Sequence, residues 1–215
     1  QQVRYYSPRF SPSGDMLAYC RNQAGGDGGS QLYLARTASW QPILLVEDVF
    51  CQGFPQIGFD WSPDGSFIAY TRSFVYAPQA NGAQWSKFHG IWSVDVSNGQ
   101  SQEIIPPPGA NPLLYPQWSP DGNWIRLYEL FYNEGLGVLR TWNRQNGALY
   151  NWLGAGQDMF PGSSDWSPDS VRLVFDQVTY VGYPGAGLFT ALPDSSSLLQ
   201  LYVNPNQGVM RPTWS

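Results

Sequence analysis

The chain has 215 residues and a formal net charge of −5, and its single lysine and scattered arginines exclude the basic surface that nucleic-acid binding requires. Aromatic residues make up 16% and charged residues only 13%, while 23 glycines and 18 prolines supply frequent turns, so the composition favours one all-β domain of short strands. No apolar run is long enough to span a bilayer, and no signal peptide is visible in the sequence.

Repeats of about fifty residues follow one another along the chain, each marked by a tight turn after an aromatic residue. The turn reads Trp-Ser-Pro-Asp-Gly from Trp61 and from Trp118, and it recurs with one or two substitutions from Phe10 and from Trp166. The Trp-Ser at Trp214 starts a fifth copy, so the successive steps are 51, 57, 48 and 48 residues. Pro presets φ, Asp bonds its own backbone and Gly accepts a positive φ, so the motif predicts a turn between two strands.

Each repeat is expected to form a four-stranded antiparallel blade whose first strand is innermost. The repeats cover approximately residues 3–48, 55–106, 113–154 and 162–204, and residues 208–215 are expected to start a further blade. The second strand is apolar on both faces in three repeats, a pattern typical of a sheet stacked between two others. Arg126 interrupts it in the third, where a structural ion pair is expected and Glu129 follows three residues on. The motif tryptophans are expected to pack between neighbouring blades (Trp61, Trp118, Trp166 and Trp214).

The longest connection in the chain runs roughly from Arg72 to His89 and lies between the second and third strands of the second repeat. Its aromatic side chains make it the candidate partner-contact loop (Phe74, Tyr76, Trp85 and Phe88), since loops carry recognition and aromatic residues anchor interfaces. Folding of this loop over its own blade is the equally favoured alternative.

The repeats resemble the WD-like β-propeller repeat of TolB-type proteins. The resemblance rests on a strand ending in Trp-Ser-Pro-Asp-Gly, then Phe67–Tyr70, then Ile91–Asp95 and a glycine turn, and it extends over essentially the whole chain. It implies a β-propeller of four-stranded blades. Because such repeats occur in periplasmic TolB, in the propeller halves of prolyl-oligopeptidase-type peptidases and in large cell-surface proteins, it implies a periplasmic, cell-surface or secreted location.

Catalytic chemistry is not expected in this chain. The sequence has no Gly-x-Ser-x-Gly elbow, and its one histidine, His89, lacks a triad around it. No His or Cys cluster predicts a metal site, and no cofactor motif is present. Asp60 and Asp165 each precede a motif tryptophan and are expected to line a central channel as solvated carboxylates. Cys20 and Cys51 could form one disulfide, although two isolated cysteines are more commonly free thiols, which is the favoured expectation.

These features predict a non-catalytic β-propeller scaffold that mediates protein–protein interaction or assembly, with a protein partner or further copies of itself. The alternative is the gating propeller of a prolyl-oligopeptidase-type serine peptidase whose catalytic domain lies elsewhere. A third hypothesis is a structural subunit that self-assembles through its incomplete ends. Five innermost strands do not fit four closed blades, so the chain is expected to be part of a larger propeller or assembly.

Overall fold

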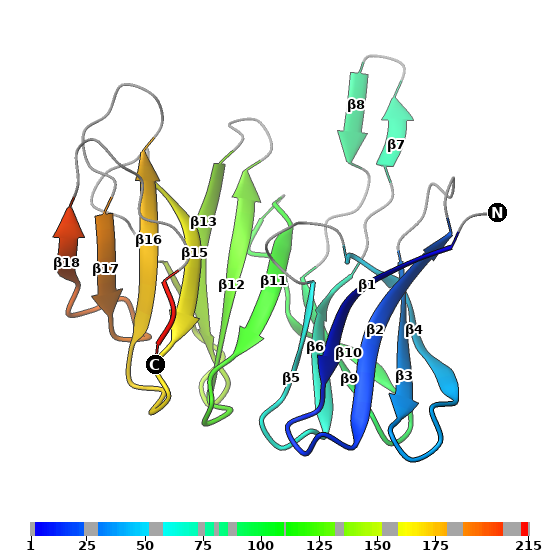
Figure 1. Cartoon of the computed structure of the whole chain (residues 1–215). Coiled ribbons are helices and arrows are strands. Elements are labelled where there is room, and N and C mark those ends of the chain that lie inside the picture. Colours follow the sequence, from blue (N-terminus) through cyan, green and yellow to red (C-terminus); the bar gives the residue numbers. More distant parts are fainter. Residues whose placement is uncertain are drawn as a thin grey trace. The chain divides into compact units, whose positions relative to one another are not determined.

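The computed structural model describes residues 3–23, 30–51, 58–72, 76–79, 82–85, 90–109, 111–131, 136–151, 159–179, 187–203 and 212–214. Every regular element in these ranges is a strand, and the strands form four four-stranded sheets and one two-stranded sheet (Figure 1). The all-β class and the four-stranded antiparallel sheets are therefore confirmed. The chain divides into two compact units, residues 1–118 and 119–215.

The four large sheets follow the sequence one after another (Figure 1). The first comprises β1 (Val3–Phe10), β2 (Met16–Gln23), β3 (Ser30–Arg36) and β4 (Pro42–Val49). The second comprises β5 (Phe59–Trp61), β6 (Phe67–Thr71), β9 (Ile91–Asp95) and β10 (Ser101–Ile105). The third comprises β11 (Leu113–Trp118), β12 (Trp124–Phe131), β13 (Leu136–Asn143) and β14 (Leu149–Asn151), and the boundary between the units falls after β11. The fourth comprises β15 (Met159–Trp166), β16 (Leu173–Thr179), β17 (Gly187–Ala191) and β18 (Leu199–Val203).

The repeated turn has the same backbone hydrogen bonds in all four sheets, and in the second, third and fourth the motif serine also donates to the motif aspartate. In the second sheet, Ser62 Oγ donates to Asp64 Oδ1 and accepts the Phe67 N–H at 2.9 Å, while the Gly65 N–H donates to the Ser62 carbonyl. Gly65 has a φ of 71°, in the left-handed region that favours glycine. The motif aspartates therefore hold turns, as the sequence predicts.

Ser170 stands where the other three turns have glycine, with a φ of 61°. Its hydroxyl accepts the backbone N–H of Asp121 at 2.9 Å, which links the turns of the third and fourth sheets within the second unit. This hydrogen bond offsets the strain of a left-handed serine and gives a physical reason for the departure from the motif.

The core of the first unit lies between the first and second sheets. We call the face that carries the third and fifth residues after the turn the leading face, and the opposite face the trailing face. Ile68 and Tyr70, on the leading face of the second sheet, belong to one buried cluster with Ala18 and Cys20, on the trailing face of the first. A leading face in this unit is thus buried by the trailing face of the preceding sheet.

Cys20 and Cys51 form a disulfide, so the expectation that favoured free thiols is wrong. Their Cα atoms are 6.3 Å apart, and both residues are buried. Cys51 follows β4, whose end bridges to Arg72 of the second sheet and whose register shifts twice against β3. This course returns the chain to the trailing face of β2, a contact that a separation of 31 residues does not reveal.

The connection between β6 and β9 contains a β-hairpin that the sequence did not predict. β7 (Tyr76–Gln79) pairs with β8 (Gly82–Trp85) as a separate two-stranded sheet (Figure 1). The pairing needs only a two-residue turn, which is the commonest hairpin connection. It places Tyr76 opposite Trp85 in the register, while Phe74, Phe88 and His89 lie outside the described residues.

Candidate interaction surfaces

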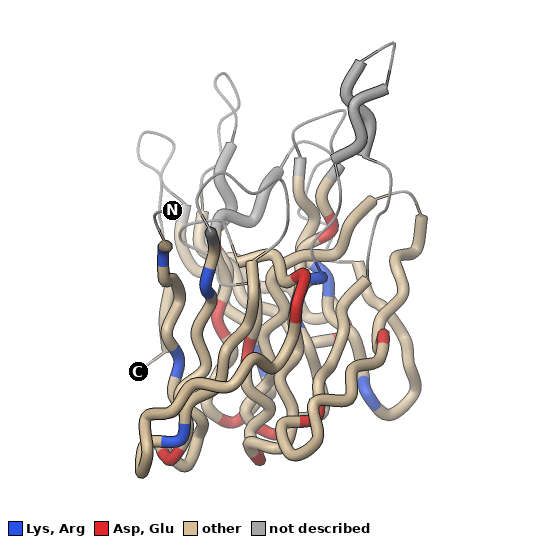
Figure 2. Tube along the Cα trace, turned by 90° about the vertical axis from the view of Figure 1, so that its right-hand side faces the viewer, with Lys and Arg blue, Asp and Glu red and all other residues tan. Residues whose placement is uncertain are grey.

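The leading face of the first sheet is an open apolar surface made largely of aromatic rings. Tyr19 stacks on Tyr33 with ring centroids 5.8 Å apart, and Tyr5 packs against Tyr19 at 5.9 Å. Tyr5 is 64% exposed, and Phe10, beside Leu17 in the register, is 57% exposed. We refer to these five residues as the tyrosine face. Figure 2 turns the first sheet toward the viewer, and the charged residues of its strands are Arg4, Arg9, Arg21, Arg36, Glu47 and Asp48.

Arg21 is the cation of this surface. Its NH1 donates to the hydroxyl of Tyr33 at 2.9 Å, and its guanidinium lies 5.6 Å from the centre of that ring. The hydrogen bond with Tyr33 raises the pKa of Arg21 above its ordinary value, so the group stays charged at any physiological pH. Its Nε is buried and has no hydrogen-bond partner among the described residues.

The same positions are buried in other sheets. Ile68 and Tyr70 correspond to Leu17 and Tyr19 and are at most 2% exposed, and Leu173 and Phe175 of the fourth sheet are at most 4% exposed. Exposure of the tyrosine face therefore does not follow from its residue types, which match those of buried faces. In the first unit, the leading face of the second sheet is buried by the trailing face of the sheet before it. The tyrosine face is the corresponding leading face of the first sheet, so the trailing face of another sheet would fit over it.

Exposed large apolar side chains of the described chain are confined to its first and fourth sheets, their turns and the carboxy-terminal segment. All of them lie in the first sheet with its turns, in the fourth sheet with its turns, or in the carboxy-terminal segment (Tyr5, Phe10, Trp40, Ile43, Leu44, Val171, Leu198, Leu199, Leu201, Tyr202 and Trp214). The described parts of the second and third sheets contribute none. Such a distribution is typical of a protein that is covered at both of these sheets.

Asp60 and Asp165 both hydrogen-bond to innermost strands. Asp60 pairs with Arg9 at 2.6 Å and accepts the Trp118 N–H at 2.9 Å, so it joins the innermost strands β1, β5 and β11. Asp165 accepts the N–H of Trp166 at 3.0 Å and that of Trp214 at 3.4 Å. Each carboxylate thus binds the backbone of the next motif tryptophan, and this periodic contact was not expected from the sequence. A channel-lining role for these residues stays a prediction.

Three of the four motif tryptophans are buried: Trp61, Trp118 and Trp166 are 4–7% exposed. Trp61 Nε1 also donates to the Arg9 carbonyl at 3.2 Å, a direct bond from the second sheet to the first. Trp214 differs, because 37% of it is exposed. Residues 204–211, which precede its short segment, lie outside the described residues. An interblade role for these residues remains the expectation.

The ion pair of the third sheet is not the expected one. Arg126 and Glu129 lie three residues apart on β12, so they point to opposite faces and do not face each other. Glu129 is instead bound by Arg140 of the neighbouring strand β13, through both Nε and NH2, and both side chains are largely buried. Arg126 lies over the ring of Tyr128 at 5.6 Å.

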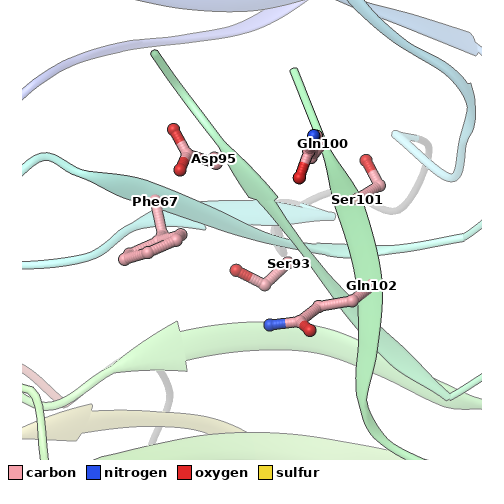
Figure 3. Close-up of a pocket in the computed structure, with 6 residues that line it drawn as sticks. All are labelled: Phe67, Ser93, Asp95, Gln100, Ser101 and Gln102. Atoms are coloured by element: carbon pink, nitrogen blue, oxygen red, sulfur yellow. The ribbon is translucent and has the colours of Figure 1, made fainter. Parts of the chain in front are cut away.

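A hollow of about 250 Å³ lies on the second sheet (Figure 3), lined by Phe67, Ser93, Asp95, Gln100, Ser101 and Gln102. Asp95, its one charged group, is already committed to a turn. Its Oδ1 accepts the N–H and hydroxyl of Ser97, and its Oδ2 accepts from Asn98. The remaining lining groups are neutral hydroxyls, amides and one ring, so the hollow offers no reactive pair of groups.

Metal sites and membrane-spanning helices are both absent from the described ranges. Within them, no three His, Cys, Asp or Glu side chains gather closely enough to hold a metal ion. In the same ranges, no helix has the length and apolar character needed to cross a membrane.

Known proteins resemble parts of this chain, although no family model matches it. The Tol-Pal system protein TolB of Gluconobacter oxydans is 32% identical over 117 residues, which are 54% of this chain and 22% of that protein. An uncharacterized protein of Agrobacterium fabrum is 28% identical over 151 residues, which are 69% of this chain and 43% of that protein. The chain therefore spans less than half of the length of either relative.

Solved structures share the fold. A TolB-type structure from Agrobacterium tumefaciens has a TM-score of 0.56 and 18% identity, over 90% of this chain and 63% of that one. The β-propeller domain of the Trilobed protease from Pyrococcus furiosus has a TM-score of 0.61 and 12% identity, over 94% and 58% of the two chains. A prolyl endopeptidase has the same TM-score and 16% identity, over 94% of this chain and 30% of that one. At these identities the likeness shows the fold alone, a β-propeller.

Proposed function

The chain is built of TolB-type β-propeller repeats, and from this we propose that it is a non-catalytic scaffold that binds other proteins outside the cytoplasm. The tyrosine face carries the proposal. It is an exposed surface whose residue types match faces that are buried elsewhere in the same chain, and aromatic residues with an arginine are the usual anchors of protein interfaces.

The disulfide supports the proposed location. Structural disulfides form and persist in oxidising compartments and are rare in the reducing cytoplasm. Cys20 and Cys51 are both buried in the core of the first unit, where a bond is protected from exchange with external thiols. The periplasm, the cell surface and the external medium all fit this chemistry.

Site-specific photo-crosslinking in the producing cells tests the proposal. A benzoylphenylalanine in place of Tyr5 is expected to give protein adducts in the cell-envelope or external fraction. The matched control places the same crosslinker at Gln102, which is exposed on β10 of the second sheet. Equal adduct yields at the two positions would contradict a docking role for the tyrosine face.

The gating propeller of a serine peptidase is the alternative proposal. A fluorophosphonate probe reacts with activated serine nucleophiles, so applied to the natural protein it distinguishes the two functions. The scaffold proposal expects no labelling and no turnover of peptide or ester substrates by the purified chain. Turnover that survives repurification and disappears with one side-chain replacement in this chain would overturn it.

Self-assembly is the third proposal, and the distribution of exposed apolar residues favours it. The first and fourth sheets of the same chain expose large apolar side chains, so a second copy can supply what each of them lacks. A contact between two different surfaces of identical chains is heterologous and extends to rings or filaments.

A further inference from the structure

Trp40 occupies a position that belongs to glycine in the neighbouring sheets. In the first sheet the N–H of Trp40 donates to the carbonyl of Arg36 at the end of β3. Gly99 makes the same bond to Asp95, and Gly147 makes it to Asn143, so the three turns are equivalent. Their φ angles are 53°, 73° and 71°, all in the left-handed region. In the fourth sheet the corresponding turn has Ser195 at a φ of 67°, so Trp40 is the one bulky side chain at this position among the described turns.

A tryptophan at this position strains the turn. A left-handed backbone places Cβ close to the following carbonyl and is unfavourable for every residue with a side chain, least so for Asn and Asp. A Cβ built on Gly99 or Gly147 meets no atom within 4 Å, so space is not what glycine provides there. Trp40 is also 55% exposed, so it gains little burial in return. A strained, exposed indole is the kind of outlier that indicates a function.

Trp40 lies two residues before β4, an edge strand that has no charged side chain in its first half. Ile43 and Leu44, on opposite faces of β4, are 56% and 44% exposed, and the first charge on the strand is Glu47. The equivalent strand of the second sheet, β10, exposes Ser101, Gln102 and Glu103 instead. Charged side chains, proline and bulges protect sheet edges against pairing; β4 has Pro42 at its first position and two register shifts against β3, but no charged side chain before Glu47.

One other described edge strand has the same character. β18 is the outermost strand of the fourth sheet, carries no charge, and exposes Leu199, Leu201 and Tyr202. The remaining outer strand, β14, is three residues long. The described chain thus carries two edge strands with exposed apolar side chains: the first half of β4, which precedes Glu47 and Asp48, and the uncharged β18.

We propose that the β4 edge of one copy pairs with the β18 edge of a second copy, and that the Trp40 indole packs on the joined strands. Backbone hydrogen bonds between the edges supply affinity, and the exposed leucines and isoleucine bury one another across the junction. This inference rests on the self-assembly form of the proposed function and names its contact. The junction is separate from the tyrosine face.

Replacement of Trp40 tests the inference without risking the fold. W40G removes the strain, so the melting temperature is expected to rise, while self-association measured by sedimentation equilibrium weakens at least about tenfold. W40N, which also tolerates the left-handed region, is expected to act in the same direction. The reverse change in the equivalent turn, G99W, should lower the melting temperature and leave association unchanged. Unchanged association of W40G would overturn the role of Trp40.

A second pair of variants tests the two edges. I43K and L201K each place a charge on an edge at an exposed position, and each is expected to be monomeric alone. Mixed together they are expected to form a one-to-one dimer that grows no further, because one intact β4 edge and one intact β18 edge remain. Q102K on β10 is the control and should associate like the unmodified chain. A mixture that stays monomeric, or single variants that associate normally, would overturn the junction.

Failure of this inference is distinguishable from failure of the proposed function. If the unmodified chain is monomeric at every concentration, the β4–β18 junction is overturned, while crosslinking from Tyr5 to another protein still supports the scaffold. If the junction forms but Tyr5 gives no more adducts than Gln102, the tyrosine face loses its role and the assembly contact stands.

Discussion

The disulfide between Cys20 and Cys51 is expected to be a large single contribution to the stability of the first unit. It closes a loop with a sequence separation of 31 residues. In the chain-entropy model, closing such a loop destabilises the unfolded state by about 3.7 kcal/mol at 25 °C. For a chain of this size each kcal/mol is worth roughly 2–4 °C in melting temperature, so reduction is expected to lower melting by about 10 °C.

Three forms of the chain separate the bond from its packing. The oxidised protein, the dithiothreitol-reduced protein and the C20A/C51A variant are unfolded in urea and followed by hydrogen exchange and mass spectrometry. Reduction keeps the buried sulfur atoms, so the difference between the reduced protein and the variant reports packing alone. Both cysteines lie in residues 1–118, so protection should fall there and not in residues 119–215. A reduced protein within about 1 kcal/mol of the oxidised one would refute the loop-closure reasoning.

Three further predictions concern buried contacts and turns. W61A is expected to lower the free energy of unfolding by about 3–5 kcal/mol, measured by urea denaturation, because it leaves a cavity; a loss below about 1 kcal/mol would contradict a packing role. E129Q should cost about 3–5 kcal/mol because the buried Arg140 loses its counter-charge, whereas the double replacement by leucine should cost less in the same measurement. The hydroxyl of Ser167 lowers the pKa of Asp169 below 3.8, so this turn stabilises the fold above that pH and loses the contribution as pH falls through the lower folded value. D169N should flatten that acid limb in pH-dependent melting, and an unchanged limb would contradict the role of the turn.

Short sequence patterns were enough to predict most of the strands and turns of the fold. β6 and β9 begin where the repeat pattern Phe67–Tyr70 and Ile91–Asp95 predicts, because each is a short, largely apolar run next to a strong turn former. The turn chemistry of the motif needs only five consecutive residues, so its strand–turn–strand geometry can be predicted from Trp61 to Gly65 alone. Burial of the motif tryptophans follows from the same regularity, with Trp214 as the exception.

Contacts between repeats were decided by the tertiary structure. The partner of Glu129 is Arg140 on the next strand, which register determines and spacing along one strand does not. The partner of Asp60 is the backbone of Trp118, 58 residues away. The disulfide depends in the same way on the course of β4, whose register shifts are not encoded in any local pattern.

By itself the sequence determined the repeat, its turns and the apolar character of both faces of the second strand in three of the four repeats, because each of these is set by neighbours within a few residues. Only the tertiary structure decided which of those faces stay open and which edges lack a partner, since exposure depends on what other sheets cover. Tyr19 and Tyr70 show this: they hold the same place in two repeats, yet the second is buried beneath the first sheet and the first lies on an open face. Trp40 shows it for the turns, because only the hydrogen bond to Arg36 reveals that it holds the position of a glycine.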